Sequence, residues 1–544
     1  MARARRVTDD PGRHLPVSKR AAWLLGYAVL TFLSFPHPVG ERVVDLGTPL
    51  AFLAPAAFWI GVRGLPPRRA ALLGFLAGLA AHSLVLHWIY VVTVTYGHAW
   101  APLGVVAVVT LAAYIALFGG LLGAASAALS PAARGLAGPF VLAALWTAVE
   151  WLRSFVFTGF PWATLGYALH ADVWLRALAP FGGVYALSLA AGLGGASLAA
   201  AHGREYRAAA AGALALAALH ALGALAAASG PPRTAGAVTV AALQGNIDQG
   251  AKWSPEWAER TLAIYEELTR TAASRGAKLV VWPETAVPGS PDADRSLLER
   301  LDALARTSGV TLVVGAVGLD GYDPVSRAAG HLHYYDSAYV LHPARGLVDR
   351  YDKTHLVPFG EYVPFRAFLG RFFSAVARGI ASADVAPGAA PRSVALPDLP
   401  TAGVELPVGI PICYELLFPD LMRHFAGDGA RALLAITNDA WYGRTGAPHQ
   451  FLVMTALRSA ESGRWTVRAA NTGVSALIDG EGNVRAQTRI FERGLVVGEL
   501  ELAAPDAPPT FYVRHGDWLP MLCAAAAAAA GAFAFRARRA GARA

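Results

Sequence analysis

The stretch Glu405-Leu-Pro-Val-Gly-Ile-Pro-Ile-Cys413-Tyr-Glu-Leu-Leu-Phe418 joins a strand-like run to a short apolar segment that we expect to be helical. The junction is a sharp turn at Cys413. A cysteine in such a turn is expected at the end of a sheet, exposed to a substrate. The only other cysteine, Cys523, lies in an alanine-rich apolar run. Because a lone cysteine is usually a small buried hydrophobic residue, the chemistry of Cys413 has to be judged from the rest of the chain.

The composition excludes a wholly soluble protein. Of the 544 residues, 55 % are hydrophobic and only 15 % are charged, and the mean hydropathy is +0.41. Two cysteines exclude a disulfide framework, and no zinc-ligand spacing, Walker loop or GxGxxG motif is present, so we expect no metal and no cofactor. The net charge of +8 does not indicate nucleic-acid binding, because the arginines flank apolar runs instead of forming one basic patch.

The first part of the chain predicts a membrane domain. Residues 1–20 form a basic N-terminal tail, and residues 21–229 contain about seven apolar runs. We predict spans near 21–36, 49–63, 70–95, 101–129, 138–152, 180–200 and 208–228. A last span near 517–535, followed by a basic tail, makes up the C-terminal segment 516–544. Some of these runs are short for the ~20 residues that a bilayer requires.

Basic residues orient the predicted spans. If the N-terminus is cytoplasmic, sixteen lysines and arginines fall in inside segments and three fall in outside loops. The opposite orientation would invert that ratio, against the usual excess of basic residues on the cytoplasmic side. We therefore expect both termini in the cytoplasm and residues 230–515 on the extracytoplasmic, periplasmic side of a multi-pass membrane protein.

Residues 230–515 predict an α/β domain. Short β-branched runs alternate with amphipathic stretches such as 256–275 and 449–462. The runs are Val238–Leu243, Lys278–Trp282, Val310–Val317, Ala432–Thr437 and Trp465–Ala469. This alternation, with Gly and Pro between the runs, is typical of an α/β sandwich. Polar residues gather at the strand ends, where α/β folds bind their ligands.

Three of these strand ends carry a reactive group: Glu284 in Trp-Pro-Glu284, Lys353 in Tyr-Asp-Lys353, and Cys413. Taken singly, Glu284 fits a helix-entry cap, and Lys353 fits a surface cation paired with Glu361. Taken together, the carboxylate can accept the thiol proton, while the ammonium favours the thiolate and stabilises an oxyanion. We therefore predict that these three residues are catalytic.

The motifs Trp-Pro-Glu284, Tyr-Asp-Lys353 and Cys413-Tyr-Glu415 resemble the Glu-Lys-Cys triad of the nitrilase (carbon–nitrogen hydrolase) superfamily. Other motifs resemble its membrane-embedded branch, the apolipoprotein N-acyltransferase family. They are Gln244-Gly-Asn-Ile-Asp-Gln249 with Lys252-Trp253, His355-Leu-Val-Pro-Phe-Gly-Glu361-Tyr362-Val-Pro364, Asn438-Asp-Ala-Trp-Tyr-Gly443 and Arg468-Ala-Ala-Asn-Thr-Gly473. The resemblance covers nearly the whole chain and implies a nitrilase-like α-β-β-α sandwich beside membrane helices. One departure is His449-Gln450, where the family often has Gln-His.

The resemblance implies an acyltransferase of the bacterial inner membrane that completes lipoprotein maturation. Cys413 would take a fatty acyl chain from a membrane phospholipid as a thioester, with Glu284 as general base and Lys353 at the oxyanion. The acceptor would be the free N-terminal amine of a diacylglyceryl-cysteine apolipoprotein. Further residues match family positions: Glu361 and Glu415 as orienting carboxylates, and Tyr414 and Trp253 near the acyl site. For the two aromatic residues, plain core packing is the alternative.

The segment 359–380 mixes aromatic and basic residues. The aromatic residues include Phe359, Tyr362, Phe372 and Phe373, and arginines lie between them. This composition suits a surface that dips into lipid headgroups. We expect the segment to bind lipid and to gate its entry and release.

Two other functions are compatible with part of the pattern. A membrane-tethered amidase would hydrolyse a small amide with the same triad, but a single anchor helix would suffice for it. A transporter or lipid scaffold with a degenerate nitrilase-like domain has no reason to keep Glu284, Lys353 and Cys413 together. The acyltransferase therefore remains the favoured prediction.

Overall fold

The computed structural model describes residues 15–250, 252, 254–321, 332–364, 385–399 and 405–543. The chain forms two compact units. The first comprises Met1–Tyr90, Ala101–Gly230 and Asp517–Ala544, and the second comprises Val91–Trp100 and Pro231–Gly516. A short segment between two helices of the first unit, Val91–Trp100, therefore belongs to the second.

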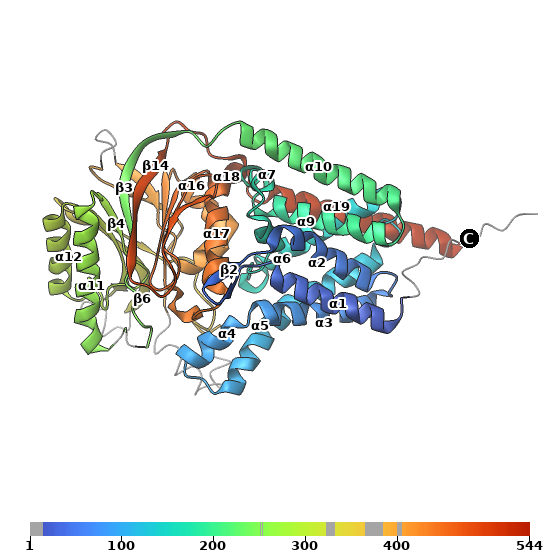
Figure 1. Cartoon of the computed structure of the whole chain (residues 1–544), viewed down its shortest axis with the longest axis horizontal. Coiled ribbons are helices and arrows are strands. Elements are labelled where there is room, and N and C mark those ends of the chain that lie inside the picture. The colour runs from blue at the N-terminus through green and yellow to red at the C-terminus, as the bar shows by residue number, and fades with distance from the viewer. Residues whose placement is uncertain are drawn as a thin grey trace, which may run out of the picture. The chain divides into compact units, whose positions relative to one another are not determined.

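The first unit is mainly helical and carries one short hairpin, β1 (His37–Val39) and β2 (Arg42–Val44) (Figure 1). Its longer helices are α1 (Val17–Leu33), α2 (Gly47–Val62), α3 (Pro67–Val85), α5 (Ala101–Ala128), α6 (Gly138–Arg153), α9 (Val184–His202), α10 (Tyr206–Ala228) and α19 (Trp518–Arg543). Among the residues that the structure describes, five helical segments are long and apolar enough to cross a membrane. They are Ala101–Ala128, Gly135–Arg153, Val184–His202, Tyr206–Ala228 and Trp518–Ala540. Several apolar helices thus fit the predicted multi-pass membrane domain.

The predicted spans differ from these helices in three places. The run 70–95 is a helix pair, Pro67–Val85 and Trp88–Tyr96, bent by 57°. The runs 21–36 and 49–63 correspond to α1 and α2, of 17 and 16 residues. At 1.5 Å per residue, such helices reach only about 25 Å, short of a ~30 Å hydrocarbon core. Among the described residues, five of the eight predicted spans thus correspond to helices long and apolar enough to cross a membrane, and the number of spans stays a prediction.

Helices α3 and α5 pack through glycines. A Cβ atom added to Gly74 on α3 would lie 2.4 Å from the carbonyl oxygen of Gly119 on α5. A Cβ atom added to Gly123 would lie 2.2 Å from the carbonyl oxygen of Ala70. Only glycine permits this approach of two backbones, which is how apolar helices associate in a membrane, where no hydrophobic effect drives them together.

We predict that Gly74→Val destabilises the first unit. The added side chain would separate the α3 and α5 backbones, at a cost of about 1–3 kcal/mol from overpacking. The measurement is the apparent melting temperature of the purified protein in detergent. The matched control is Gly26→Val on α1, where nothing lies within 4 Å of an added Cβ. An equal melting temperature for Gly74→Val and Gly26→Val would contradict the proposed packing.

The second unit contains two six-stranded sheets. The first sheet has the order β14 (Gly494–Ala503), β3 (Thr234–Gln244), β4 (Leu279–Val281), β5 (Thr311–Asp320), β6 (His333–His342) and β7 (Gly346–Asp352). The second has the order β13 (Val484–Gln487), β12 (Ala476–Ile478), β11 (Thr466–Ala470), β10 (Ala432–Thr437), β9 (Leu406–Gly409) and β8 (Ser393–Leu396). Three neighbouring strands are parallel in each sheet, β3-β4-β5 and β9-β10-β11.

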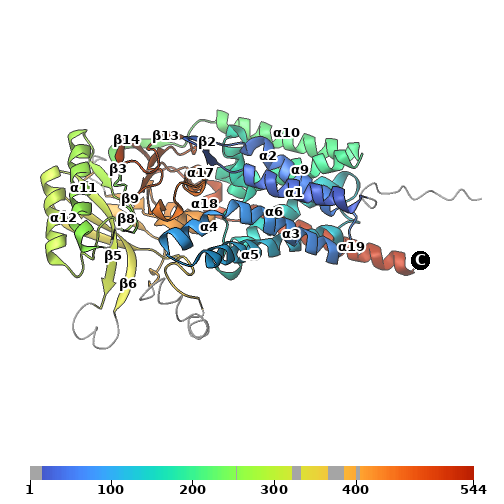
Figure 2. The same ribbon diagram turned by 60° about the horizontal axis from the view of Figure 1, so that its bottom comes forward.

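Helices cover the outer faces of both sheets. Helices α11 (Pro255–Ser274) and α12 (Arg295–Ser308) lie side by side against the first sheet (Figures 1 and 2). Helices α16 (Pro419–Gly427) and α17 (Ala447–Ser462) pack on the second, and β3 faces β11 between the sheets. The predicted α-β-β-α sandwich is therefore confirmed.

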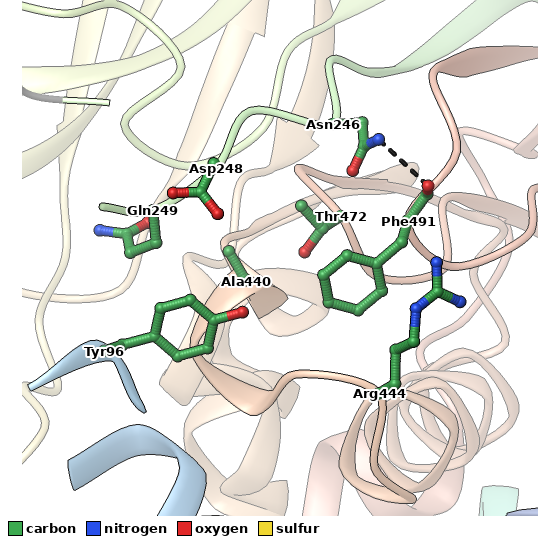
Figure 3. A pocket seen from close by; sticks show the side chains of 8 residues that line it. All are labelled: Tyr96, Asn246, Asp248, Gln249, Ala440, Arg444, Thr472 and Phe491. Atoms are coloured by element: carbon green, nitrogen blue, oxygen red, sulfur yellow. Dashed lines mark hydrogen bonds between the residues drawn. The ribbon is translucent and has the colours of Figure 1, made fainter. Parts of the chain in front are cut away.

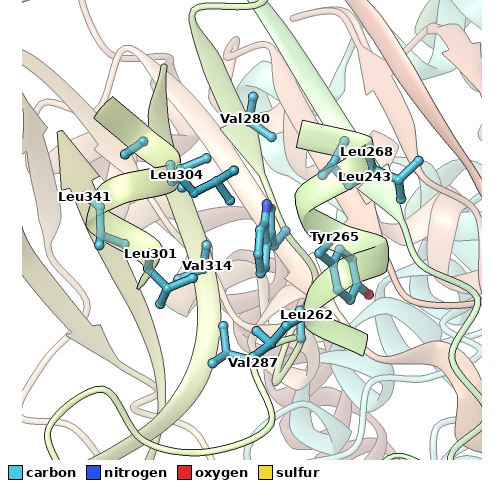
Figure 4. Close-up of a cluster of buried hydrophobic side chains, with 14 of the residues drawn as sticks. Leu243, Leu262, Tyr265, Leu268, Val280, Val287, Leu301, Leu304, Val314 and Leu341 are labelled. Carbon is cyan, nitrogen blue, oxygen red and sulfur yellow. The ribbon is translucent and has the colours of Figure 1, made fainter. Parts of the chain in front are cut away.

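A continuous apolar core lies between the first sheet and its helices. Leu243, Val280 and Val314 of the sheet meet leucines of α11 and α12 (Figure 4). Tyr265 stacks on Trp282 with ring centroids 4.9 Å apart. Because Trp282 directly precedes Pro283 and Glu284, this core fixes the start of the segment that carries Glu284.

The carboxyl ends of the parallel strands bring polar segments together. Asn246 follows β3 and its N–H donates to the carbonyl of Asn471, which follows β11, at 2.9 Å. Asn438 follows β10, and its N–H donates to the side chain of Glu284, which follows β4, at 2.7 Å. Ends of parallel strands in α/β folds are the usual place for ligand sites, and the candidate site lies there.

Candidate active site

Cys413 sits in a strained turn. Its φ angle is +47°, in the left-handed region that non-glycine residues rarely occupy and that is often retained at functional sites. Ile412 bridges to Ile436 of β10, and Cys413 begins the 3₁₀ helix η5 (Cys413–Leu417), which leads into α16. The sharp turn lies where it was predicted. The expectation of an exposed cysteine was wrong, because Cys413 is only 8 % exposed.

Glu415 holds the turn in place. Its Oε2 accepts the N–H of Ile412 at 2.8 Å. Its Oε1 accepts the N–H and the hydroxyl of Thr354, each at 2.7 Å, and the hydroxyl of Tyr351 at 2.9 Å. Thr354 directly follows Lys353. One fully buried carboxylate therefore ties the backbone beside Cys413 to the backbone beside Lys353.

We predict that Glu415→Gln destabilises the second unit and impairs the site. An amide has a single acceptor oxygen, so its NH₂ group would face a donor, and each buried donor left unpaired costs about 1–3 kcal/mol. The measurements are the melting temperature and the rate at which a thiol reagent modifies Cys413. The control is Glu267→Gln on the exposed side of α11. Equal values for the two variants would show that Glu415 does not hold the turn.

Lys353 is the centre of the charged cluster. Its ammonium is fully buried and contacts three carboxylates: Glu361 at 2.5 Å, Glu284 at 3.2 Å and Asp336 at 3.3 Å. Burial alone would lower the pKa of Lys353, but the neighbouring carboxylates, Glu361 and Glu284 foremost, raise it well above the usual value. Lys353 is therefore a permanent cation, enclosed by the side chains of Glu361, Glu284 and Asp336.

Glu284 connects Lys353 to Cys413. Its Oε1 contacts the ammonium, its Oε2 accepts the N–H of Asn438, and its charge acts on the Cys413 thiol. Burial raises the pKa of Glu284, but the charge of Lys353, with contributions from Asp336 and Cys413, outweighs burial, so the pKa lies below the usual value. Burial and the charge of Glu284 raise the pKa of the Cys413 thiol well above its usual value. The resting pair is therefore a thiol beside a carboxylate.

Of the other predicted residues, one contacts Lys353, three lie elsewhere in the described structure, and three lie outside it. Glu361 accepts the N–H of Val357 at 2.8 Å through Oε2 while its Oε1 contacts Lys353. Tyr414 is buried and stacks on His355 with ring centroids 5.6 Å apart. Phe359, with φ +63°, is 55 % exposed, and Tyr362 is partly buried. Trp253, Phe372 and Phe373 lie outside the described residues.

Three neighbours of the triad were missed as candidates. Asp336 lies within β6, and its carboxylate contacts Lys353. Lys252 is 1 % exposed, and its ammonium donates to the hydroxyl of Thr285 at 2.7 Å. Burial lowers the pKa of Lys252 to about 8. Asn438 was noted only as part of a motif. The sequence does carry a signal for Asp336, because it is an acidic residue inside a strand-forming run and buried strand positions rarely carry a charge.

A pocket of about 320 Å³ adjoins this cluster (Figure 3). Its lining residues are Tyr96, Asn246, Asp248, Gln249, Ala440, Arg444, Thr472 and Phe491. Asp248 and Gln249 lie on one side, and Arg444 and Phe491 on the other (Figure 3). The Oε1 of Gln249 accepts from the side chain of Asn438 at 2.8 Å, and the N–H of Asn438 donates to Glu284. Asn438 is therefore the one residue between the pocket lining and Glu284. Tyr96 ends the π-helix η1 (Val91–Tyr96), which packs on the 3₁₀ helix η6 (Asp439–Tyr442).

Two family models match the chain. Residues 239–507 match "Carbon-nitrogen hydrolase", and residues 27–197 match "Apolipoprotein N-acyltransferase N-terminal domain". The first match covers the sandwich with its charged cluster, and the second covers most of the apolar helices that precede it.

Similar proteins extend over most of the chain. An apolipoprotein N-acyltransferase from Geobacter metallireducens is 36 % identical over 516 residues, which are 93 % of this chain and 94 % of the relative. The chain belongs to the apolipoprotein N-acyltransferase family. A second member, from Pseudomonas syringae, is 36 % identical over 87 % of this chain and 90 % of its own length. Membership of this family identifies the chain as an enzyme of the carbon–nitrogen hydrolase superfamily.

Solved structures with similarity include an amidase from Nesterenkonia sp.. It is 19 % identical, with a TM-score of 0.36, and the match covers 53 % of this chain and 96 % of the amidase. Another structure of an amidase from the same source is 19 % identical, with a TM-score of 0.36 over 51 % of this chain.

Proposed function

We propose that the protein transfers a fatty acyl chain from a membrane phospholipid to the N-terminal amine of a diacylglyceryl-cysteine apolipoprotein. The observation that carries the proposal is the buried Glu284 carboxylate, which lies 3.2 Å from the Lys353 ammonium and whose charge acts on the Cys413 thiol. A thiol, a base and an oxyanion-stabilising cation are the groups that acyl transfer through a covalent intermediate requires. The apolar helices and the family membership support a lipoprotein-modifying membrane enzyme.

The first half-reaction forms a thioester. Glu284 takes the proton of the Cys413 thiol, and the thiolate attacks the ester carbonyl carbon of the phospholipid. The Lys353 ammonium, with a backbone N–H after Cys413, stabilises the oxyanion. The bond between the carbonyl carbon and the glycerol oxygen then breaks. The lysophospholipid leaves with the proton that Glu284 returns to its oxygen, and the acyl group stays on sulfur.

The second half-reaction forms an amide. The acceptor amine attacks the thioester carbonyl and gives one proton to Glu284. The carbon–sulfur bond breaks, and Glu284 returns the proton to the Cys413 sulfur. A neutral thiol and an ionised Glu284 are thus restored after each ping-pong cycle.

Carboxylates around the triad keep its geometry. Glu361 and Glu415 touch the Lys353 ammonium and the Cys413 turn, respectively, so we assign them orienting roles. Tyr414 packs beside the turn on His355, whose pKa is lowered to about 4 by burial and by Lys353. His355 is therefore neutral near pH 7 and adds no second cation beside Tyr414. We keep Trp253, Phe359, Tyr362, Phe372 and Phe373 as proposed lipid contacts.

The proposed location is the bacterial inner membrane, with both termini in the cytoplasm and the catalytic unit on the periplasmic side. Its support is the distribution of lysines and arginines along the chain, sixteen against three, which follows the positive-inside rule. The rival function, a tethered amidase, would use the same triad. It would need only one anchoring helix, whereas five helices in the part of the chain that the structure describes are long and apolar enough to span a membrane.

We predict a thioester on Cys413. After exposure of the purified protein to phospholipid, intact-mass spectrometry should show a gain of one fatty acyl group that hydroxylamine removes. Cys413→Ala should show no gain, and Glu284→Gln should form the adduct at least ~100-fold more slowly, because its base is lost. Active protein without an adduct, together with ammonia release from small amides, would favour the amidase.

We place the peptide that follows the acceptor cysteine in the pocket next to Gln249. The pocket offers one carboxylate and one guanidinium, Asp248 and Arg444, and a buried Thr472 hydroxyl that has no hydrogen-bond partner among the described residues. A neutral ligand with both donors and acceptors fits such a lining better than a phosphate, which would face Asp248.

The prediction for this pocket separates the two half-reactions. Thr472→Val should raise the KM for a diacylated peptide about fivefold, the loss of roughly one hydrogen bond, because the hydroxyl is removed without a change of shape. Thioester formation from phospholipid should stay within about twofold of the wild-type rate. The opposite pattern, slow thioester formation with an unchanged acceptor KM, would assign the pocket to the lipid headgroup.

A further inference from the structure

Asp336 faces the same ammonium as the proposed base. It lies near the start of β6, is 7 % exposed, and its Oδ2 is 3.3 Å from the Lys353 ammonium. The backbone N–H of Lys353 donates to the carbonyl of Asp336 at 2.9 Å. Because β6 and β7 are hydrogen-bonded neighbours, the position of Asp336 is fixed by the sheet. The pairing of β6 with β7 therefore holds the backbone of Asp336 beside that of Lys353.

The charges around Lys353 do not balance if every carboxyl group is ionised. Oxygens of Glu284, Asp336 and Glu361 lie within 4.8 Å of one another. The ammonium groups that act on this cluster are Lys353 and Lys252. Three anions against two cations would leave a net negative charge in a buried site. Carboxyl groups held this close lower their repulsion by retaining a proton on one of them.

The contacts indicate which group holds the proton. Glu284 accepts a backbone N–H from Asn438, and Glu361 accepts one from Val357. Such bonds favour the ionised form. The Oδ1 of Asp336 is buried and meets no hydrogen-bond donor among the described residues. Asp336 also contacts the ammonium at a longer distance than Glu361 does, 3.3 Å against 2.5 Å.

The closeness of Asp336 and Glu284 agrees with this assignment, since oxygens of the two side chains lie within 4.8 Å of each other. Two carboxyl groups can share a hydrogen bond only when one of them is protonated. Burial and the charge of Glu284 raise the pKa of Asp336 well above the usual value, while the charge of Lys353 and the neighbouring Asp336 lower that of Glu284. Both directions leave the proton on Asp336 and not on Glu284.

We propose that Asp336 is a neutral carboxylic acid that donates a hydrogen bond to ionised Glu284 and so positions it toward Cys413. The inference rests on the proposed role of Glu284 as base. The proton stays on Asp336 through both half-reactions, and Glu284 alone exchanges protons with Cys413 and the substrates. Asp336 is thus a positioning residue that keeps Glu284 both ionised and oriented.

The protonation state is tested directly by infrared difference spectroscopy. The spectrum of the wild-type protein minus that of Asp336→Asn at pH 7 should contain the carbonyl stretch of a protonated carboxylic acid. The control is Asp398→Asn, which removes a surface carboxylate paired with Arg345 and should give a carboxylate band only. If the difference spectrum for Asp336→Asn contained a carboxylate band instead, the proposal would be overturned, whatever the activity of the protein.

The role in positioning is tested by the pH dependence of thioester formation. In Asp336→Ala the hydrogen-bond donor to Glu284 is lost, so the pKa of Glu284 should rise. The acid limb of the pH–rate profile should then move to higher pH, and the rate of thioester formation should fall about tenfold. In Asp336→Asn the amide still donates, so the rate should recover to within about threefold and the acid limb should stay within about 0.5 unit of the wild-type position. If Asp336 were an anion, Asp336→Asn would remove a negative charge and move the acid limb to lower pH. That shift would overturn the proposal, whereas loss of the thioester in wild-type protein would instead contradict the proposed function.

Discussion

The buried Lys353 ammonium is the constraint on which the second unit depends. A cation with no exposed surface is tolerated only when anions and hydrogen bonds replace its hydration. Here Glu284, Glu361 and Asp336 supply that replacement, and each comes from a different segment of the chain. The need to neutralise one charge therefore fixes the ends of β4, β6 and β7 relative to one another. The same contacts keep Glu284 ionised beside a thiol whose pKa is raised.

The second sheet meets this cluster through two residues. Asn438 donates its N–H to Glu284 and its side chain to Gln249, and its own side-chain oxygen accepts from Asn471 at 3.2 Å. Glu415 ties the Cys413 turn to Thr354. A thiol on the second sheet and a base on the first sheet are thus brought together by hydrogen bonds between the sheets. The apolar cores under each sheet provide stability, and these polar contacts provide the geometry.

The sequence allowed the sandwich and the three central residues to be predicted, because each depends on a local pattern. Glu284, Lys353 and Cys413 each follow a strand-like run, and strand ends of α/β folds collect polar residues. Asp336 was missed because it lies inside a strand, and its approach to Lys353 follows from the pairing of β6 with β7. The bend near Leu86 was missed because hydropathy continues across it without a proline or glycine. The burial of Cys413 depends on side chains from other elements, which a local pattern does not contain.

The assignment of Val91–Trp100 to the catalytic unit has a consequence for dissecting the enzyme. These residues precede most of the membrane helices in the chain, yet Tyr96 lines the pocket beside Gln249, and its ring centroid lies 6.3 Å from that of Trp441. A soluble fragment that starts at Pro231 would lack one wall of this pocket. Gene truncation therefore cannot isolate the complete second unit. A deletion or tag insertion at 91–100 would alter this unit, although a linear domain map assigns those residues to the helical part of the chain.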